Sequence, residues 1–107
     1  MQKLFKALAS EPRRRILSYL AAEPLTVGEI ADNFEMTLPS ISRHLALLKE
    51  AGLVREQKRG QYVLYSLAKE RLADQLYEFL APFCPDAQRI TDERGRKGGR
   101  SKARALN

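Results

Sequence analysis

The residues of this 107-residue chain that are best suited to chemistry lie in one short segment. Ser42, Arg43 and His44 follow one another in a stretch whose apolar residues have helical spacing. An arginine guanidinium can donate two parallel hydrogen bonds to O6 and N7 of guanine, and short hydroxyl groups can reach base edges or phosphates. Serine and histidine also occur in nucleophilic sites, but neighbouring helix positions point apart and no carboxylate to orient the histidine is evident. The sequence therefore predicts DNA contact, with no catalytic residue.

A helix over residues 38–51 is predicted to present these side chains. Thr37 is a good N-cap, because its hydroxyl can accept a hydrogen bond from the backbone N–H of Ser40. Pro39 suits the first turn, and Gly52 predicts a left-handed stop after the last turn. One side of this helix is apolar and is expected to be buried: Leu38, Ile41, Leu45 and Leu48. Taken alone, the stretch fits a DNA-reading helix and an ordinary amphipathic surface helix equally well.

The segments before this helix predict a helix-turn-helix. A short helix is expected over residues 3–9, and Ser10-Glu11-Pro12 predicts the start of a second. Three arginines, residues 13–15, follow in its first turns; they are either solvated, paired with acids such as Glu11 and Glu29, or in contact with phosphate. After a break at residues 22–24, Thr26 and Glu29 form a capping-box pattern, and a tight turn at residues 35–36 leads into the helix over 38–51.

A β-hairpin is predicted after Gly52, where the apolar period changes. Residues 54–58 and 62–67 alternate as strands, and residues 59–61 are expected to turn with Gly60 at the tip. A hairpin directly after a helix-turn-helix is a wing, and its basic residues suit phosphates or the minor groove. The alternative is an exposed polar hairpin that takes no part in DNA binding.

The longest predicted helix covers residues 68–83 and ends near Pro82 and Pro85. It brings more apolar surface than the core of one small winged domain needs, and with the helix over 3–9 it is the expected dimer surface. The alternative is that both helices close the monomer core. The predicted dimer residues are Leu4, Phe5, Leu8, Leu72, Leu76, Phe79, Leu80 and Phe83.

Charge is distributed unevenly along the chain. All 13 acidic residues and 13 of the 19 Lys/Arg fall within residues 1–93, so the net charge of +6 arises from residues 94–107. The predicted division is a DNA-binding and dimerisation domain over residues 1–84 and a flexible basic tail over residues 85–107, which binds polyanions or only aids solubility. With no signal peptide or membrane span evident, the expected location is the cytoplasm.

Three strings in the sequence resemble the ArsR/SmtB family of small dimeric bacterial winged-helix repressors. They are Leu-Ala-Ser-Glu-Pro-Arg-Arg-Arg-Ile-Leu at residues 8–17, Val-Gly-Glu-Ile-Ala at 27–31, and Pro-Ser-Ile-Ser-Arg-His-Leu at 39–45, continuing through Leu-Lys-Glu-Ala-Gly-Leu-Val at 48–54. The resemblance covers residues 4 to about 80. It implies a symmetric dimer built on the first and last helices, a recognition helix over 38–51 and a wing over 58–62.

The metal-binding residues of that family have no counterparts here. Many members hold a soft metal with a Leu-Cys-Val-Cys-Asp pattern, but this chain has Thr26 and Gly28 where the thiolates would stand. Others bind zinc across the last helices with Asp and His, and here that helix has no histidine. No metal or other cofactor is therefore predicted. Cys84, the single cysteine, is either inert or a redox sensor across the dimer.

The function predicted from these features is a sequence-specific transcriptional regulator, a repressor or autorepressor, that binds an inverted-repeat operator in double-stranded DNA as a homodimer. The alternatives are a sequence-tolerant architectural DNA binder and a winged-helix protein-interaction module. The effector is not identifiable from the residues. The predicted fold class is mainly α with a small β-hairpin, a winged helix-turn-helix. The predicted DNA-binding residues are Thr37, Ser40, Ser42, Arg43, His44, Lys58, Arg59 and Gln61.

Overall fold

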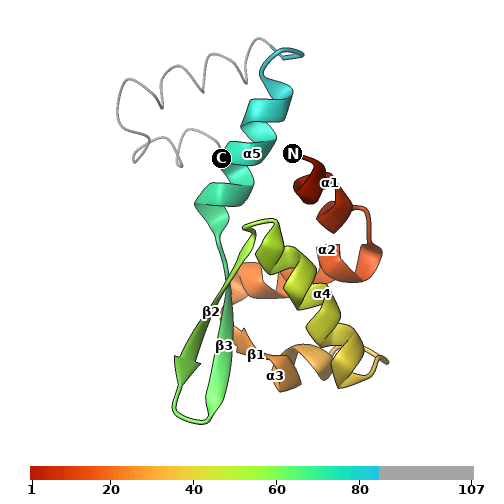
Figure 1. Ribbon diagram of the computed structural model, residues 1–107, viewed down its shortest axis with the longest axis vertical. Helices are drawn as coiled ribbons and strands as arrows, with labels where there is room; N and C mark the ends of the chain where they lie inside the picture. Colours follow the sequence, from red (N-terminus) through yellow and green to blue (C-terminus); the bar gives the residue numbers. More distant parts are fainter. Residues whose placement is uncertain (85–107) are drawn as a thin grey trace. The chain divides into compact units, whose positions relative to one another are not determined.

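The computed structural model describes residues 1–84 and contains five helices and three short strands within that range. The chain divides into two compact units, residues 1–72 and residues 73 onward, and α5 runs across the division. Figure 1 labels the elements along the chain. Their bounds are α1 Gln2–Leu8, α2 Glu11–Ala22, β1 Leu25–Thr26, α3 Val27–Ala31, α4 Leu38–Glu50, β2 Val54–Arg59, β3 Tyr62–Leu67 and α5 Lys69–Leu80.

Side-chain caps fix where three of the helices begin. Ser10 accepts a hydrogen bond from the backbone N–H of Arg13 at 3.3 Å, which starts α2. Thr26 and Glu29 form the predicted capping box at α3, with hydrogen bonds of 3.2 and 2.9 Å. Thr37 accepts from the N–H of Ser40 at 3.2 Å, so α4 begins where the sequence predicts.

The sheet contains one strand that the sequence does not predict. β2 and β3 form the predicted hairpin, and β1 pairs antiparallel with β3 on its other edge, giving the order β1-β3-β2. Gly60 has φ of +60°, and no described residue other than glycine has a positive φ, so the two-residue turn Gly60-Gln61 has a type II′ pattern. The turn is one residue shorter than predicted, because Arg59 still pairs with Tyr62.

The core of the first unit lies between α1, α2, α3, α4 and the base of the hairpin, which pack on one another (Figure 1). Each helix contributes one apolar side, and burying these side chains provides the main driving force for folding. The fully buried large side chains are Leu4, Ile16, Ile30, Ile41, Leu45, Leu48 and Leu53.

Four expectations from the sequence need correction. Leu38 is expected on the buried side of α4 but is 52% exposed, because the first turn of α4 extends beyond the core. Leu4 is expected in the dimer surface but is completely buried within the chain. The last helix ends at Leu80, not at residue 83, and α4 ends at Glu50, one residue before the expected end at residue 51.

The second unit is described only over residues 73–84. It contains the end of α5 and the turn that follows, and the ring of Phe79 in α5 lies 5.4 Å from the ring of Phe83 in this turn. The predicted tail over residues 85–107 lies outside the described residues. Within residues 1–84, none of the helices is long and apolar enough to cross a membrane.

Candidate nucleic-acid interface

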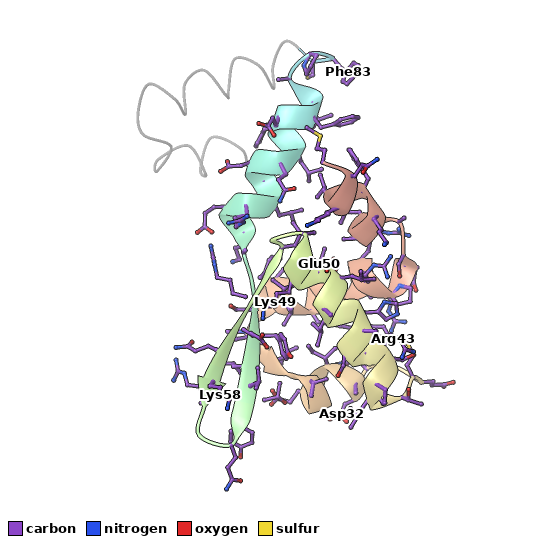
Figure 2. The ribbon with its side chains drawn as sticks, viewed as in Figure 1. Asp32, Arg43, Lys49, Glu50, Lys58 and Phe83 are labelled. Carbon is purple, nitrogen blue, oxygen red and sulfur yellow. The ribbon has the colours of Figure 1, made fainter. Side chains whose placement is uncertain are left out.

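The outer side of α4 is polar and open to solvent. Ser42, Arg43 and Ala46 are exposed on it, opposite the buried Ile41 and Leu45. Figure 2 shows Arg43 on the side of α4 that faces away from the packed helices. A long cation beside small side chains leaves room for a base edge to approach the helix, as an α-helix in a major groove requires.

The start of α4 adds two kinds of hydrogen-bonding group, namely side-chain hydroxyls and backbone N–H groups. Thr37 is exposed, but its hydroxyl is already the N-cap acceptor, whereas Ser40 is half-buried. Backbone N–H groups in the first turn of a helix are suited to a phosphate. The exposed side chain of Leu38 stands in the same turn, where the helical pattern predicts a buried one.

His44 is hydrogen-bonded to Arg13 of α2. Nη1 of Arg13 lies 3.1 Å from Nδ1 of His44, and a guanidinium can only donate, so Nδ1 must be the acceptor and Nε2 carries the proton. Burial lowers the pKa of His44 below its usual value, and the charges of Arg13 and Arg43 lower that pKa further. His44 is therefore neutral at physiological pH and can donate only through Nε2.

The first two arginines of α2 donate hydrogen bonds to backbone carbonyl oxygens at the end of α1. Arg13 also donates to the carbonyl oxygens of Lys6 and Ala7, both at 2.8 Å, and Arg14 donates to that of Leu8 at 2.7 Å. These carbonyls lie at the end of α1, where acceptors lack a full set of helical partners; that of Lys6 also accepts from the backbone N–H of Ala9. This role of the two arginines is absent from the sequence-based predictions, although cations next to a helix C-terminus are a usable signal.

Arg15, the third arginine, contacts an aromatic ring, a backbone carbonyl and an acid. Its guanidinium lies 4.3 Å from the centre of the Phe34 ring and donates to the carbonyl oxygen of Asn33 at 3.0 Å. Glu11 is 3.9 Å away, which agrees with one of the predicted pairings, and the expected pairing with Glu29 is replaced by the capping box. Arg15 therefore joins α2 to the turn before α4.

The tip of the hairpin is basic and exposed. Lys58, Arg59 and Gln61 all lie on the surface, and Lys58 is seen near the far end of the hairpin in Figure 2. Arg59 makes a long contact of 3.5 Å with Gln57 of the same strand. Cations in this position can reach the phosphate backbone beside a groove that α4 occupies.

A polar network between α4 and the hairpin is not predicted from the sequence. Lys49 forms an ion pair with Glu56 of β2, and Tyr65 lies opposite Glu56 on β3, where its hydroxyl also lowers the pKa of the Glu56 carboxyl. The pairing of Glu56 with Tyr65 follows from the hairpin register, so a correct two-residue turn would have revealed it.

Metal ligands do not gather in the described part of the chain. No group of three or more His, Cys, Asp or Glu side chains within residues 1–84 is arranged to hold a metal ion. Thr26, at a position where the related pattern has a thiolate, is occupied in the capping box. Cys84 is a half-buried free thiol at the end of the described range.

The sequence matches the family described as "Bacterial regulatory protein, arsR family" over residues 10–56. It is also 40% identical over 76 residues to the transcriptional repressor SdpR of Bacillus subtilis, a match that covers 71% of this chain and 84% of SdpR. The chain belongs to the ArsR family. It is therefore a DNA-binding transcriptional regulator, as the sequence predicts.

Solved structures of ArsR-family proteins have the same fold. The crystal structure of the regulator RHA00566 superposes with a TM-score of 0.70 at 34% identity, over 76% of this chain and 88% of that one. The solution structure of the homodimeric winged helix-turn-helix domain of Mb0332 from Mycobacterium bovis gives 0.63 at 34% identity, over 76% and 77% of the two chains. The predicted winged helix-turn-helix is confirmed, with α3 and α4 as its helices and β2–β3 as its wing.

Proposed function

We propose that this ArsR-family protein is a homodimeric repressor that binds an inverted-repeat operator through α4. The observation that carries the proposal is the exposed face of α4, where Arg43 stands among small side chains and the basic wing tip follows in the chain. Occupying such an operator would block a promoter, which is how the protein would repress. SdpR, to which the chain is 40% identical, is itself a transcriptional repressor.

Each polar side chain of α4 and its N-cap has a distinct role in the proposed complex. Arg43 would donate two hydrogen bonds to a guanine in the major groove, and Ser42 would reach a neighbouring base edge or phosphate. Thr37 and Ser40 would lie against the phosphate at the start of α4. The Nε2–H of His44 is suited to a phosphate oxygen, because Arg13 already occupies Nδ1.

The wing would position the duplex without reading its sequence. Lys58, Arg59 and Gln61 are the predicted contacts, and contacts to phosphate supply affinity rather than base discrimination. The exposed cations of the tip support this part of the proposal.

The proposed dimer uses apolar side chains of α1 and α5. Phe5, Phe79, Leu80 and Phe83 are exposed by 38–71%, while Leu8, Leu72 and Leu76 are half-buried. Burying such side chains against a second copy is favourable by about 25 cal/mol per Å² of apolar surface. A two-fold dimer would place two copies of α4 in successive major grooves about 34 Å apart, so the operator is expected to be an inverted repeat.

We also propose that the protein works in the cytoplasm, that it is not an enzyme and that it binds DNA without a metal ion. The occupation of Thr26 by helix capping supports the last point, since that position offers no metal ligand. The molecule that releases the repressor is left open.

The test is binding to the DNA upstream of its own gene, measured by mobility shift with excess random competitor at two salt concentrations. Arg43→Ala is expected to weaken operator binding by about 1–3 kcal/mol, roughly 5- to 150-fold, and to relax one base position. Arg14→Ala is the matched control, because it removes the same charge from α2 and not from the face of α4. An unchanged affinity and footprint in Arg43→Ala would remove Arg43 from the reading role.

The basic residues 94–107 favour one second candidate, a sequence-tolerant architectural DNA binder. In that case random competitor would abolish the shift. No shift at either salt concentration would favour a protein-interaction module instead.

A further inference from the structure

We propose that Glu56 supports operator specificity indirectly: it fixes the wing to the recognition helix, through Lys49 on one side and Tyr65 on the other, so that the phosphate contacts of the wing hold α4 in register with the bases. The inference rests on the proposed function, because it concerns how α4 and the wing meet the same operator. Glu56 is a positioning residue in this proposal and makes no contact with DNA.

Glu56 lies where three elements meet. Its carboxylate pairs with the ammonium group of Lys49, near the C-terminal end of α4, and Tyr65 lies directly opposite it on the neighbouring strand. Figure 2 shows Lys49 at the point where α4 approaches the hairpin. The ammonium of Lys49 lowers the pKa of the Glu56 carboxyl, and the carboxylate raises the pKa of Lys49, so both groups stay charged across the physiological range.

The same three side chains line a small cavity beside the DNA-facing side of α4. The cavity measures about 160 Å³, and its other lining residues are Ser42, Leu45 and Ala46. Ser42 and Ala46 belong to the exposed face of α4. The network is therefore next to the surface that would read bases.

The hairpin is supported at its base, where Val54 is buried, and at the level where β1 pairs with β3. In β2 only Val54 is buried, and the five residues from Arg55 to Arg59 are exposed. β1 pairs with β3 at Tyr65 and Leu64, which lie level with Glu56 and Gln57 on the other strand. Beyond that level the hairpin has only two strands.

Because this two-stranded segment is long, a small rotation where it begins would move the tip of the wing by a large distance. From Gln57 to the tip at Gly60 is three residues, or about 10 Å at roughly 3.3 Å per residue. A rotation of about 10° at this level would then move the tip by about 2 Å, which is more than a hydrogen bond tolerates. The tie between Glu56 and Lys49 resists such a rotation.

The network also controls the charge beside the groove. While Lys49 is paired with Glu56, its ammonium group is not free to bind a backbone phosphate, a contact that DNA of any sequence offers. Removing the carboxylate charge would release Lys49 and add up to one phosphate contact, which steepens the salt dependence of binding by about 0.9. Loss of Glu56 should therefore strengthen non-specific binding while it weakens the preference for the operator.

The experiment compares Glu56→Gln with a matched control, Glu70→Gln. Glu70 is an exposed carboxylate paired with Arg55 at 3.8 Å, so its loss changes the net charge equally without touching α4. Affinities for operator and random duplexes are measured by fluorescence anisotropy at three salt concentrations. In Glu56→Gln the ratio of the two affinities is expected to fall about tenfold, which corresponds to about 1.4 kcal/mol, the scale of one lost hydrogen bond. In Glu70→Gln both affinities should change together and the ratio should stay.

Tyr65→Phe tests the network without altering charge. It removes one hydroxyl and should lower the same ratio by a smaller factor, with unchanged salt dependence. Circular dichroism and thermal unfolding establish that each variant is folded. Equal ratios in Glu56→Gln and Glu70→Gln would overturn the proposal.

A measurement on the free protein separates this proposal from the proposed function. Backbone order parameters of residues 56–65 are expected to fall in Glu56→Gln and to stay unchanged in Glu70→Gln. Unchanged order parameters in Glu56→Gln would refute the tie even if the wild type bound its operator well. Absence of operator binding by the wild type would refute the proposed function, whatever the order parameters show.

Discussion

Replacing Arg13 by alanine is expected to destabilise the fold more than replacing the neighbouring Arg14. Arg13 donates hydrogen bonds to the carbonyl oxygens of Lys6 and Ala7 at 2.8 Å and to Nδ1 of His44 at 3.1 Å. It therefore ties the end of α1 and the middle of α4 to the first turn of α2. Alanine at this position removes the side-chain donor from the Ala7 carbonyl and from one imidazole nitrogen, and leaves the Lys6 carbonyl with only the backbone N–H of Ala9 at 3.4 Å.

The size of the effect follows from the exposure of the three bonds. The bonds to Ala7 and His44 are partly buried, and each contributes about 1 kcal/mol net. The bond to Lys6 is exposed and adds about 0.5 kcal/mol. We expect Arg13→Ala to lower the free energy of unfolding by roughly 2–3 kcal/mol. Arg14→Ala removes one exposed bond and should cost about 0.5 kcal/mol.

The assay is urea unfolding followed by circular dichroism, with all proteins at one concentration, because a dimer's stability depends on concentration. Arg13→Lys keeps the charge but not the planar fork, so its free energy of unfolding should fall between those of the wild type and Arg13→Ala. If Arg13→Ala and Arg14→Ala lower the free energy of unfolding equally, the bonds to α1 and His44 do not act as described and the reasoning is refuted.

Three further predictions concern single features of the chain. Because the folded protein lowers the pKa of His44 below the usual 6.5, its contribution to stability is present above about pH 6.5 and is lost as the pH falls below that value. In thermal unfolding this part of the pH dependence should vanish in His44→Gln, a clean comparison since His44 is the single histidine. Gly52→Ala and Gly60→Ala both force alanine to a positive φ and should each cost about 1–2 kcal/mol of unfolding free energy, and an unchanged stability in either variant would contradict the geometry. At Gly52 the added Cβ would also displace the end of the flexible Arg71 side chain. Deleting residues 94–107 should lower the slope of log affinity against log salt by about 0.9 for each phosphate that the tail neutralises, and an identical slope would exclude the tail from binding.

Local features of the fold were predictable because their causes are local in sequence. The caps of α3 and α4, the stop at Gly52 and the hairpin tip at Gly60 each depend on residues within four positions of one another. The apolar period of α4 likewise predicted which of its sides is buried, except at Leu38 in the first turn. The family resemblance then extended these local assignments to the winged helix-turn-helix.

The candidate interface was predictable to a similar extent. The exposed face containing Ser42 and Arg43 follows from the helical wheel alone, and the basic tip follows from the position of Gly60. The partners of these residues did not follow. Arg13 lies 31 positions before His44, and no periodic pattern relates two such positions.

Sequence by itself thus determined the elements, their caps and the outward side of α4, since these depend on backbone geometry over one or two turns. The tertiary structure alone decided which charged side chains have partners on other elements: Arg13 with His44, and Lys49 with Glu56. It also decided that Leu4 is buried and Leu38 is not, because burial depends on what other elements cover. Long-range contacts of this kind are set by packing, which brings together residues that the chain holds far apart.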